Sequence, residues 1–239
     1  MKQIWVISKR ELQSFFDSLT AYIMLIAFLG FSGLFTWLYG SDIFFIKQAS
    51  LQAFFGVAYW TLFFFIPALT MRQFAEENKT GTIELLLTRS VNDWQVVLGK
   101  FLATLLLIVL ALVFTIPYYI TVASLGNIDH GATISGYLGL ILISAAYISI
   151  GIFTSSITNN QIVGFLLALA IGILFHFVFS FLAGGAGGIA SEVLYYLSIS
   201  SHFESISRGV IDSKDLIFFL SIIFLGLVST EAILQKNRN

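Results

Sequence analysis

The chain has 239 residues, of which 58% are hydrophobic and only 10% charged, and its formal net charge is −1. A soluble domain of this length would need more polar surface, and the balanced charge gives no basic patch for nucleic acid. The absence of cysteine excludes disulfides, thiolate metal sites and cysteine nucleophiles. The three histidines, at positions 130, 176 and 202, lack the spacing of metal ligands.

Long charge-free stretches define the protein class. No Asp, Glu, Lys or Arg occurs in residues 18–41, 48–71, 101–128 and 130–191. A charged residue at the centre of a membrane helix costs roughly 2.5–3.5 kcal/mol, and a span needs about 20 apolar residues. The sequence therefore predicts an all-α integral membrane protein with six transmembrane helices, at about residues 19–39, 52–71, 98–123, 134–154, 161–182 and 215–234. Pro67 and Pro117 lie within the second and third spans and predict a kink in each.

The segment before the first span, residues 2–18, is amphipathic. Its apolar residues can share one helical stripe, which comprises Ile4, Trp5, Leu12, Phe15 and Phe16. We expect an interfacial helix over residues 1–18, lying along the membrane surface. The alternative is a simple flank of the first span, with Trp5 as an interface anchor.

Lysine and arginine positions predict the orientation of the chain. An even number of spans places both termini on one side, together with the loop between the second and third spans. That side carries most of the cations, namely Lys2, Lys9, Arg10, Arg72, Lys79, Arg89, Lys100, Lys236 and Arg238, against Lys47, Arg208 and Lys214 on the other. Both termini and loop 72–97 are therefore expected to be cytoplasmic.

Three residues inside the spans are candidates for a translocation path. Tyr59 and Trp60 lie in the middle of the second span, and His176 lies in the fifth, on a stripe of small residues that begins at Gly164. His176 has an ordinary pKa near neutrality and could line a substrate path or relay a proton. All three residues could equally serve helix packing.

The polar loop between the second and third spans contains FAEENKTGTIELLLTRSVNDW at residues 74–94. Gly81 can cap a short helix that carries the leucines, and Ser90-x-x-Asp93 predicts a capping box for the next long helix. Either lipid or a protein groove must cover these leucines. The acids Glu76, Glu77 and Glu84 would be repelled by anionic lipid, but the residues alone do not decide between lipid and a protein groove.

The same loop resembles the signature of type-2 ABC exporter permeases, which is [KR]-x-G-T-x-E-x-L-L followed by Gly-Lys at the head of the third span. Lys79, Gly81, Thr82, Glu84, Leu86 and Leu87 match this pattern. Arg89-Ser90 stands where the family often has a proline. The resemblance covers the whole chain as one permease domain, residues 1–239, with a long outer segment at 183–214 before the sixth span.

The resemblance implies that this loop contains a coupling helix seated in a cleft of a separate ATP-binding subunit. The implied contact residues are Glu76, Glu77, Lys79, Gly81, Thr82, Glu84, Leu86, Leu87 and Arg89. Gly99-Lys100 lacks the rest of a phosphate-binding loop, so this chain is not expected to bind ATP itself. The resemblance implies that two copies of the ATPase bind ATP and magnesium. A second permease copy or a sister membrane subunit would complete the complex, in a bacterial inner membrane.

Three longer segments, including LGNIDHGATISGYLGL and AAYISIGIFTSSITNNQIV, are similar to gliding-motility-associated permeases of Bacteroidetes. A permease for nitrous-oxide-reductase maturation has similar motifs in the same loop. Two other functions are weighed beside export. One is an ATP-driven membrane scaffold that moves no solute. The other is an ion-coupled carrier, which the lack of acids within the spans disfavours.

Overall fold

The computed structural model describes residues 2–38, 48–82 and 92–238, and the regular secondary structure of these residues is helical. The elements in chain order are α1 (Lys2–Asp17), α2 (Thr20–Trp37), α4 (Gln52–Thr70), α5 (Ala75–Thr80), α7 (Asp93–Val113), α8 (Ile116–Leu125), α9 (His130–Ser156), α10 (Gln161–Ile173), the π-helical turn η1 (Leu174–Val178), α11 (Phe179–Gly185), α12 (Ile189–Tyr196), α13 (Ile199–Ser207) and α14 (Ser213–Arg238).

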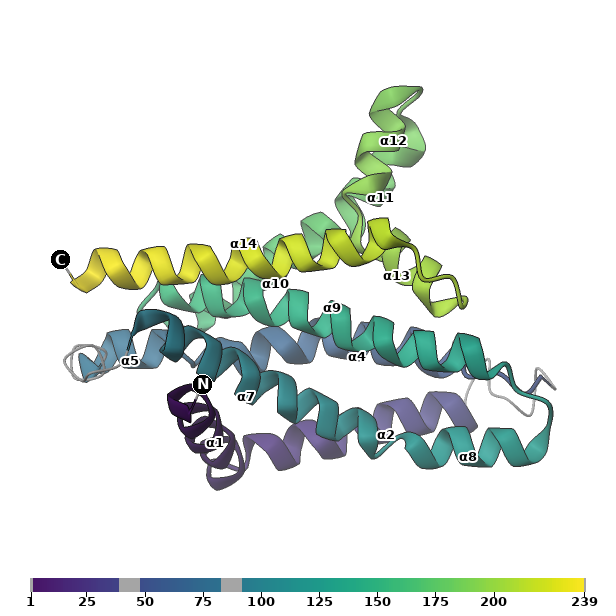
Figure 1. The fold of residues 1–239 in the computed structure, drawn as a ribbon, viewed down its shortest axis with the longest axis horizontal. Helices are drawn as coiled ribbons and strands as arrows, with labels where there is room; N and C mark the ends of the chain where they lie inside the picture. The colour runs from purple at the N-terminus through teal and green to yellow at the C-terminus, as the bar shows by residue number, and fades with distance from the viewer. Residues whose placement is uncertain (1, 39–47, 83–91, 239) are drawn as a thin grey trace.

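Six helical stretches of the described chain are long and apolar enough to cross a membrane, which confirms the predicted spans. They are Thr20–Trp37, Gln52–Thr80, Asp93–Leu125, His130–Ser156, Gln161–Gly185 and Ser213–Lys236. Figure 1 shows them side by side in one elongated bundle. We call the end that carries α5 and the C-terminus the terminal end, and the end that carries α8 and α13 the opposite end.

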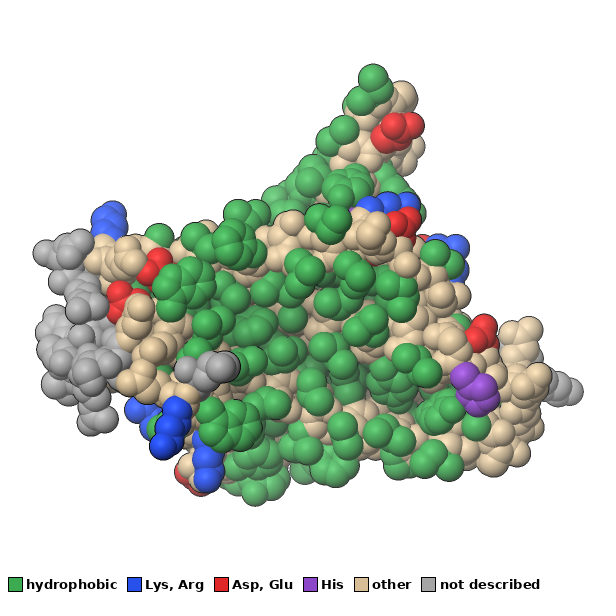
Figure 2. Space-filling view, viewed as in Figure 1, with side chains coloured by type: hydrophobic (Ala, Val, Ile, Leu, Met, Phe, Trp, Pro, Cys, Tyr) green, Lys and Arg blue, Asp and Glu red, His purple; other side chains and the backbone are tan. Residues whose placement is uncertain are grey.

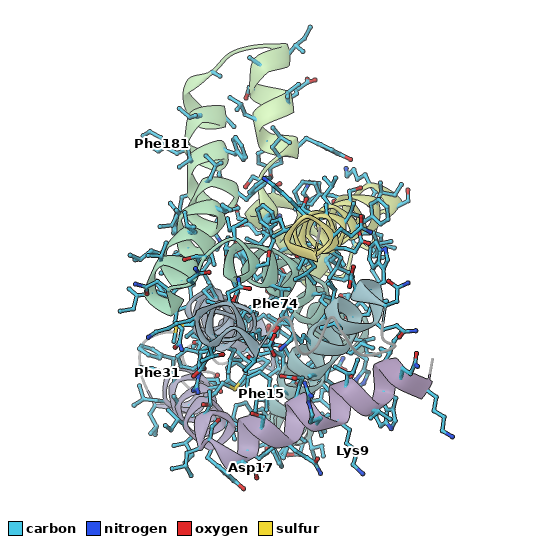
Figure 3. The ribbon with its side chains drawn as sticks, turned by 90° about the vertical axis from the view of Figure 1, so that its left-hand side faces the viewer. Lys9, Phe15, Asp17, Phe31, Phe74 and Phe181 are labelled. Atoms are coloured by element: carbon cyan, nitrogen blue, oxygen red, sulfur yellow. The ribbon has the colours of Figure 1, made fainter. Side chains whose placement is uncertain are left out.

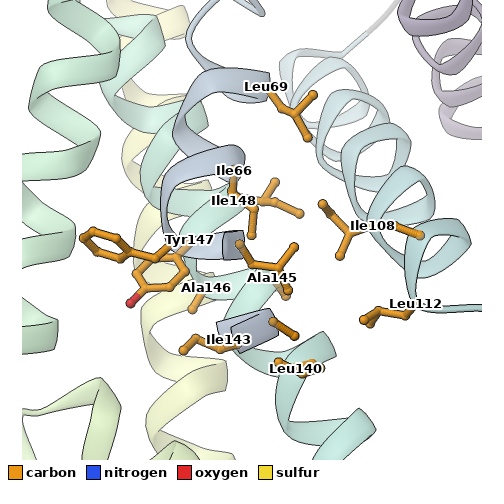
Figure 4. Packing of buried hydrophobic residues seen from close by; sticks show 14 of the residues in the cluster. Ile66, Leu69, Ile108, Leu112, Leu140, Ile143, Ala145, Ala146, Tyr147 and Ile148 are labelled. Atoms are coloured by element: carbon orange, nitrogen blue, oxygen red, sulfur yellow. The ribbon is translucent and has the colours of Figure 1, made fainter. Parts of the chain in front are cut away.

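Helix α9 is the centre of the bundle, and 78% of its most apolar stretch is buried, against 33%, 22% and 28% for the spans Thr20–Trp37, Gln161–Gly185 and Ser213–Lys236. Small residues let its neighbours approach closely. A Cβ atom on Gly136 would lie 2.4 Å from the ring of Phe55, and one on Gly151 would lie 2.0 Å from Thr70 Oγ1. Figure 4 shows Ile143 and Ile148 of α9 in the core that α4 and α7 complete.

The outer helices leave a broad apolar surface, visible in Figure 2 as an almost continuous hydrophobic band along the bundle. Ile26 on α2, Leu166 on α10 and Phe224 on α14 are 72%, 56% and 64% exposed. A soluble monomer rarely exposes such an area. This surface is therefore suited to lipid or to other membrane subunits.

The two prolines occupy different local positions. Pro67 lies inside α4, which remains helical to Thr70. Pro117 lies in the first turn of α8, after α7 has ended at Val113. A proline fits a first turn because the amide hydrogens there have no intrahelical acceptor. The third span is thus interrupted before Pro117 rather than bent around it.

The segment before the sixth span forms the short helices α12 and α13. Helices α11 and α12 extend sideways from the bundle as a pair (Figure 1). The hydroxyl of Ser191 donates to the carbonyl of Ala183 at 2.8 Å and ties the two helices together. Gly188 turns the chain between them with φ 63°, a conformation that favours glycine.

Candidate functional site

Helix α5 forms the first part of the polar loop. It ends at Gly81, whose φ of 69° and ψ of 8° give the left-handed C-cap for which glycine is preferred. Thr82 is again helical, so Gly81 marks a break in the helix between Thr80 and Thr82. The sequence reasoning placed Gly81 before a short helix and missed the helix that Gly81 closes. The predicted leucine-rich helix and the implied contact residues Glu84, Leu86, Leu87 and Arg89 lie outside the described residues.

The start of α7 differs from the prediction. The helix begins at Asp93 with Asn92 as its N-cap, so the expected box of Ser90 and Asp93 is wrong. The amide of Trp94 donates to Asn92 Oδ1 at 3.4 Å, and the amide of Asn92 donates to Gln95 Oε1 at 3.2 Å. Asparagine caps helices as well as serine does, and Gln95 supplies the reciprocal bond, so the two patterns compete in this sequence.

Lys100 is the centre of a buried polar cluster at the terminal end. Its side chain is 1% exposed. The ammonium donates to Glu77 Oε1 at 2.7 Å and to the carbonyl of Gln73 at 2.8 Å, and it lies 3.5 Å from Glu11 Oε2. It also lies 5.0 Å from the ring centroid of Phe74, a cation–π distance. Lys100 thereby joins α1, α5 and α7, and we call Glu11, Glu77 and Lys100 the charge clasp.

The clasp places two carboxylates around one ammonium. Burial of the Glu11 carboxylate works to raise its pKa, but attraction from Lys100 and Arg10 outweighs burial, and the pKa lies below the ordinary 4.5. Removing one partner from a buried ion pair leaves an uncompensated charge and costs roughly 3–5 kcal/mol. The three helices are therefore expected to hold together as long as the clasp is intact.

Helix α5 is also fixed to the end of α9. The Ser155 hydroxyl accepts from the amides of Phe74 and Ala75 at 3.0 and 3.1 Å and donates to the carbonyl of Met71 at 3.0 Å. The side-chain amide of Asn78 donates to the carbonyl of Ser156 at 3.1 Å. These bonds compensate backbone groups at the break between α4 and α5. Helix α5 is thus attached to α9 as well as to α7.

Helix α1 packs along α7 and, in Figures 1 and 3, runs across the direction of the spans. Ser8 is fully buried and donates to the carbonyl of Gly99 at 2.9 Å. A Cβ on Gly99 would lie 2.5 Å from Ile7 Cγ2, so only glycine permits this approach. The predicted helix is confirmed, and Figure 3 shows Phe15 turned toward the bundle.

Part of the predicted stripe of α1 packs against the bundle, and part does not. Leu12, Phe15 and Phe16 pack against the core, but Trp5 is 60% exposed. The buried face instead includes Ser8, a polar residue that a hydrophobic pattern cannot identify. The available signal was its spacing: Ser8 lies four residues after Ile4 and three before Glu11, which places the three side chains on one face of a helix.

The described contact residues fall into two groups. Glu76, Lys79, Gly81 and Thr82 are exposed at the terminal end and available to a partner. Glu77 points inward to Lys100, with 19% of its side chain exposed. The structure therefore separates an exposed edge of α5 from an inward face that belongs to the charge clasp.

The residues suggested for a translocation path form a packed aromatic group. Tyr59 and His176 are 7% and 4% exposed, and their rings stack with centroids 4.5 Å apart. The Tyr59 hydroxyl lies 2.7 Å from His176 Nδ1, and the Tyr147 hydroxyl, which sequence reasoning missed, lies 2.9 Å from the same nitrogen. Trp60 is 42% exposed, with its ring centroid 4.9 Å from that of His176.

His176 lies within the π-helical turn η1, a local widening of a helix that recurs at functional positions. Its carbonyl accepts from the Ser200 hydroxyl at 3.2 Å, and Tyr59 stacks on Phe203 at 4.6 Å. Spans α4 and α9 and helix α13 thus converge on one histidine. The group can hold these helices in register.

The fold and the terminal cluster define a class. Six apolar spans form one bundle around α9, which is one of the six and is rich in small residues, and an amphipathic helix and a polar loop are joined at one end by buried charges. The molecule is a multi-pass helical membrane protein.

Residues 44–233 match the profile of a family described as ABC-2 family transporter protein, and the chain belongs to this family. It is therefore a membrane permease of an ABC transporter and is expected to pair with an ABC ATPase. The comparison with curated proteins gave no match. Helices α1 and α2 lie before the matched residues.

Proposed function

We propose that this chain couples ATP hydrolysis by a separate ATPase subunit to export across a bacterial inner membrane, with the terminal end in the cytoplasm. The observation that carries the proposal is the charge clasp, which joins the helix beside the coupling segment to two other helices. An ATPase seated on the exposed edge of α5 would then act on α1, α7 and α9 together.

The transmission path consists of short, directed contacts. Helix α5 reaches α9 through Ser155 and Asn78, and it reaches α7 and α1 through Lys100. Buried charge-assisted bonds resist displacement more than exposed pairs do. A push on α5 therefore moves a set of helices as one body, which coupling requires.

The proposed orientation agrees with the charge distribution. Lys2, Lys9 and Arg10 of α1 and Arg72 and Lys79 near α5 lie at the terminal end. Figure 2 shows basic side chains at that end of the described surface. Cytoplasmic loops carry an excess of such residues.

The complex we propose contains two copies of the ATPase, which hold ATP and magnesium, and a second permease copy or a sister subunit. The exposed apolar faces of α2, α10 and α14 provide area for such a subunit beside lipid. The resemblance to gliding-motility permeases supports a role in that system. A strain that lacks the gene and still glides would exclude the role.

A second candidate function is an ATP-driven scaffold that moves no solute. The sideways extension of α11 and α12 favours it, because this pair could engage a neighbouring membrane assembly (Figure 1). The purified complex can be reconstituted into vesicles with its ATPase side outward. ATP-dependent uptake of a solute into these vesicles would support export, whereas ATP hydrolysis without any moved solute would support the scaffold.

Copurification from native membranes tests the coupling proposal. Reversing Glu84 to lysine together with Leu86→Ala should abolish capture of the ATPase or its stimulation by the permease. The matched control is Lys236→Glu, another charge reversal near the terminal end. If the double variant captures and stimulates the ATPase as the unmodified chain does, the loop is not the coupling element.

A further inference from the structure

A cavity of about 470 Å³ lies at the opposite end, among α12, α13 and the start of α14. Its rim carries Glu192, Arg208 and Lys214, and its wall includes Tyr196. Figure 2 shows charged side chains of both signs beside the base of the α11–α12 pair. The cavity is remote from the charge clasp and plays no part in the proposed coupling.

The buried side of the cavity is formed by His202 and Asp215, which are 4% and 1% exposed. His202 Nε2 donates to the carbonyl of Tyr196 at 2.8 Å, and Nδ1 lies 2.6 Å from Asp215 Oδ1, within hydrogen-bond distance. The other carboxylate oxygen, Asp215 Oδ2, is buried and has no hydrogen-bond partner in the structure. Buried polar atoms nearly always have a hydrogen-bond partner, so we expect a hydrogen-bond donor to pair with this oxygen.

The basic rim residues are available to a ligand. Arg208 pairs with Glu204 at 3.1 Å and Lys214 with Asp212 at 3.2 Å, and in each pair both side chains are more than 40% exposed. Exposed ion pairs of this kind contribute little stability. An anion entering the cavity can therefore replace these acids at small cost.

The cavity lies where a membrane surface is expected. Asp215 is in the first turn of α14, the helix that forms the sixth span. Tyr195 and Tyr196 are 53% and 45% exposed, and tyrosine is enriched at the level of lipid headgroups. Ile189, at the other end of α12, is 81% exposed and suits acyl chains. The group most abundant at this depth is a phospholipid headgroup.

We propose that this cavity binds the phosphoethanolamine headgroup of a membrane phospholipid. Its primary ammonium supplies the N–H that Asp215 Oδ2 lacks once this oxygen, which is closed off in the structure, turns toward the cavity, and Glu192 adds negative charge at the rim. Its phosphate lies beside Lys214 and Arg208. A choline headgroup carries no N–H, and a glycerol headgroup carries no positive charge for the two acids, so the charge pattern selects ethanolamine.

Native mass spectrometry of the detergent-purified chain, titrated with phosphatidylethanolamine, phosphatidylcholine or phosphatidylglycerol of matched acyl chains, tests this site. The unmodified chain should retain phosphatidylethanolamine best, and Asp215→Asn should weaken that retention roughly tenfold, as expected for loss of a charge-assisted bond. Lys214→Gln and Glu192→Gln, both at the exposed rim, should each weaken it severalfold and keep the test valid if Asp215→Asn does not fold.

The matched control is Asp212→Asn, which removes an exposed acid beside Lys214 that does not line the cavity. It should leave retention unchanged or raise it slightly, because it frees Lys214 for the phosphate. Equal retention of the three lipids, or equal losses in Asp212→Asn and Lys214→Gln, would overturn the proposal. So would capture of soluble glycerophosphoethanolamine without capture of the lipid, because the source would then not be the membrane.

Discussion

At the scale of single residues, Lys100 shows how a charge is tolerated beside the membrane. Two carboxylates, one carbonyl and one aromatic ring surround its ammonium. Each partner comes from a segment that is distant in sequence, so the cluster forms only when α1, α5 and α7 meet. The stability of the contacts of Lys100 therefore measures whether α1, α5 and α7 are packed together at the terminal end.

Lys100→Met should destabilise the protein by roughly 3–5 kcal/mol, because it leaves Glu11 and Glu77 buried without their cation. The control Lys79→Met removes an exposed lysine of α5 and should change stability by less than about 0.5 kcal/mol. Unfolding followed in detergent measures both. The triple variant Glu11→Gln, Glu77→Gln, Lys100→Met should recover most of the loss, and failure to recover any would mean that the clasp is not the cause.

The depressed pKa of Glu11 gives a pH dependence with a definite sign. The ionised carboxylate contributes stability above its unfolded value near 4.5, and this contribution is lost as pH falls through the lower folded value. The unfolding temperature of the unmodified chain should therefore fall more steeply below pH 4.5 than that of Glu11→Gln. Parallel pH profiles would contradict the pairing of Glu11 with Lys100.

At the scale of elements, the docking of α1 depends on one glycine. Gly99→Ala places a Cβ 2.5 Å from Ile7 Cγ2 and should push α1 off α7, at a cost of about 1–3 kcal/mol. Gly30→Ala in α2, where nothing lies within 4 Å, should be neutral or slightly stabilising. Hydrogen exchange in α1 distinguishes the two, and Ile7→Ala should restore protection in the Gly99→Ala background. Unchanged protection in Gly99→Ala alone would show that α1 is held elsewhere.

The elements also show what the sequence could and could not predict. Five of the six spans could be predicted from long charge-free runs, because lipid penalises charge along a whole helix, and the sixth from the apolar stretch between Asp215 and Glu231. The caps were harder, since Ser90 and Asn92 both fit a helix start and only the fold selects Asn92. The charge clasp was missed because Glu11, Glu77 and Lys100 lie far apart in the sequence, so no helical spacing relates them. The pair of His202 and Asp215 spans two helices and was missed for the same reason.

At the scale of the whole molecule, two features lie at different ends of one bundle. The terminal end joins α1, α5, α7 and α9 through buried polar bonds, and the opposite end holds a cavity with a buried, half-paired carboxylate. Between them, α9 and the group around His176 connect the ends through tightly packed helices. Such packing transmits small displacements because close-packed helices cannot deform freely.

The account rests on α5 and the residues after it facing the cytoplasm and contacting the ATPase. The chain has no cysteine, so Thr82→Cys introduces a single reactive thiol at an exposed position, with Ser213→Cys as the control at the opposite end. In intact cells an impermeant maleimide should label the introduced cysteine of the Ser213→Cys control but not that of Thr82→Cys. In native membranes a thiol cross-linker should join the Thr82→Cys variant, but not the control, to the ATPase. Labelling of the Thr82→Cys variant from outside, or cross-linking of the control alone, would contradict the account.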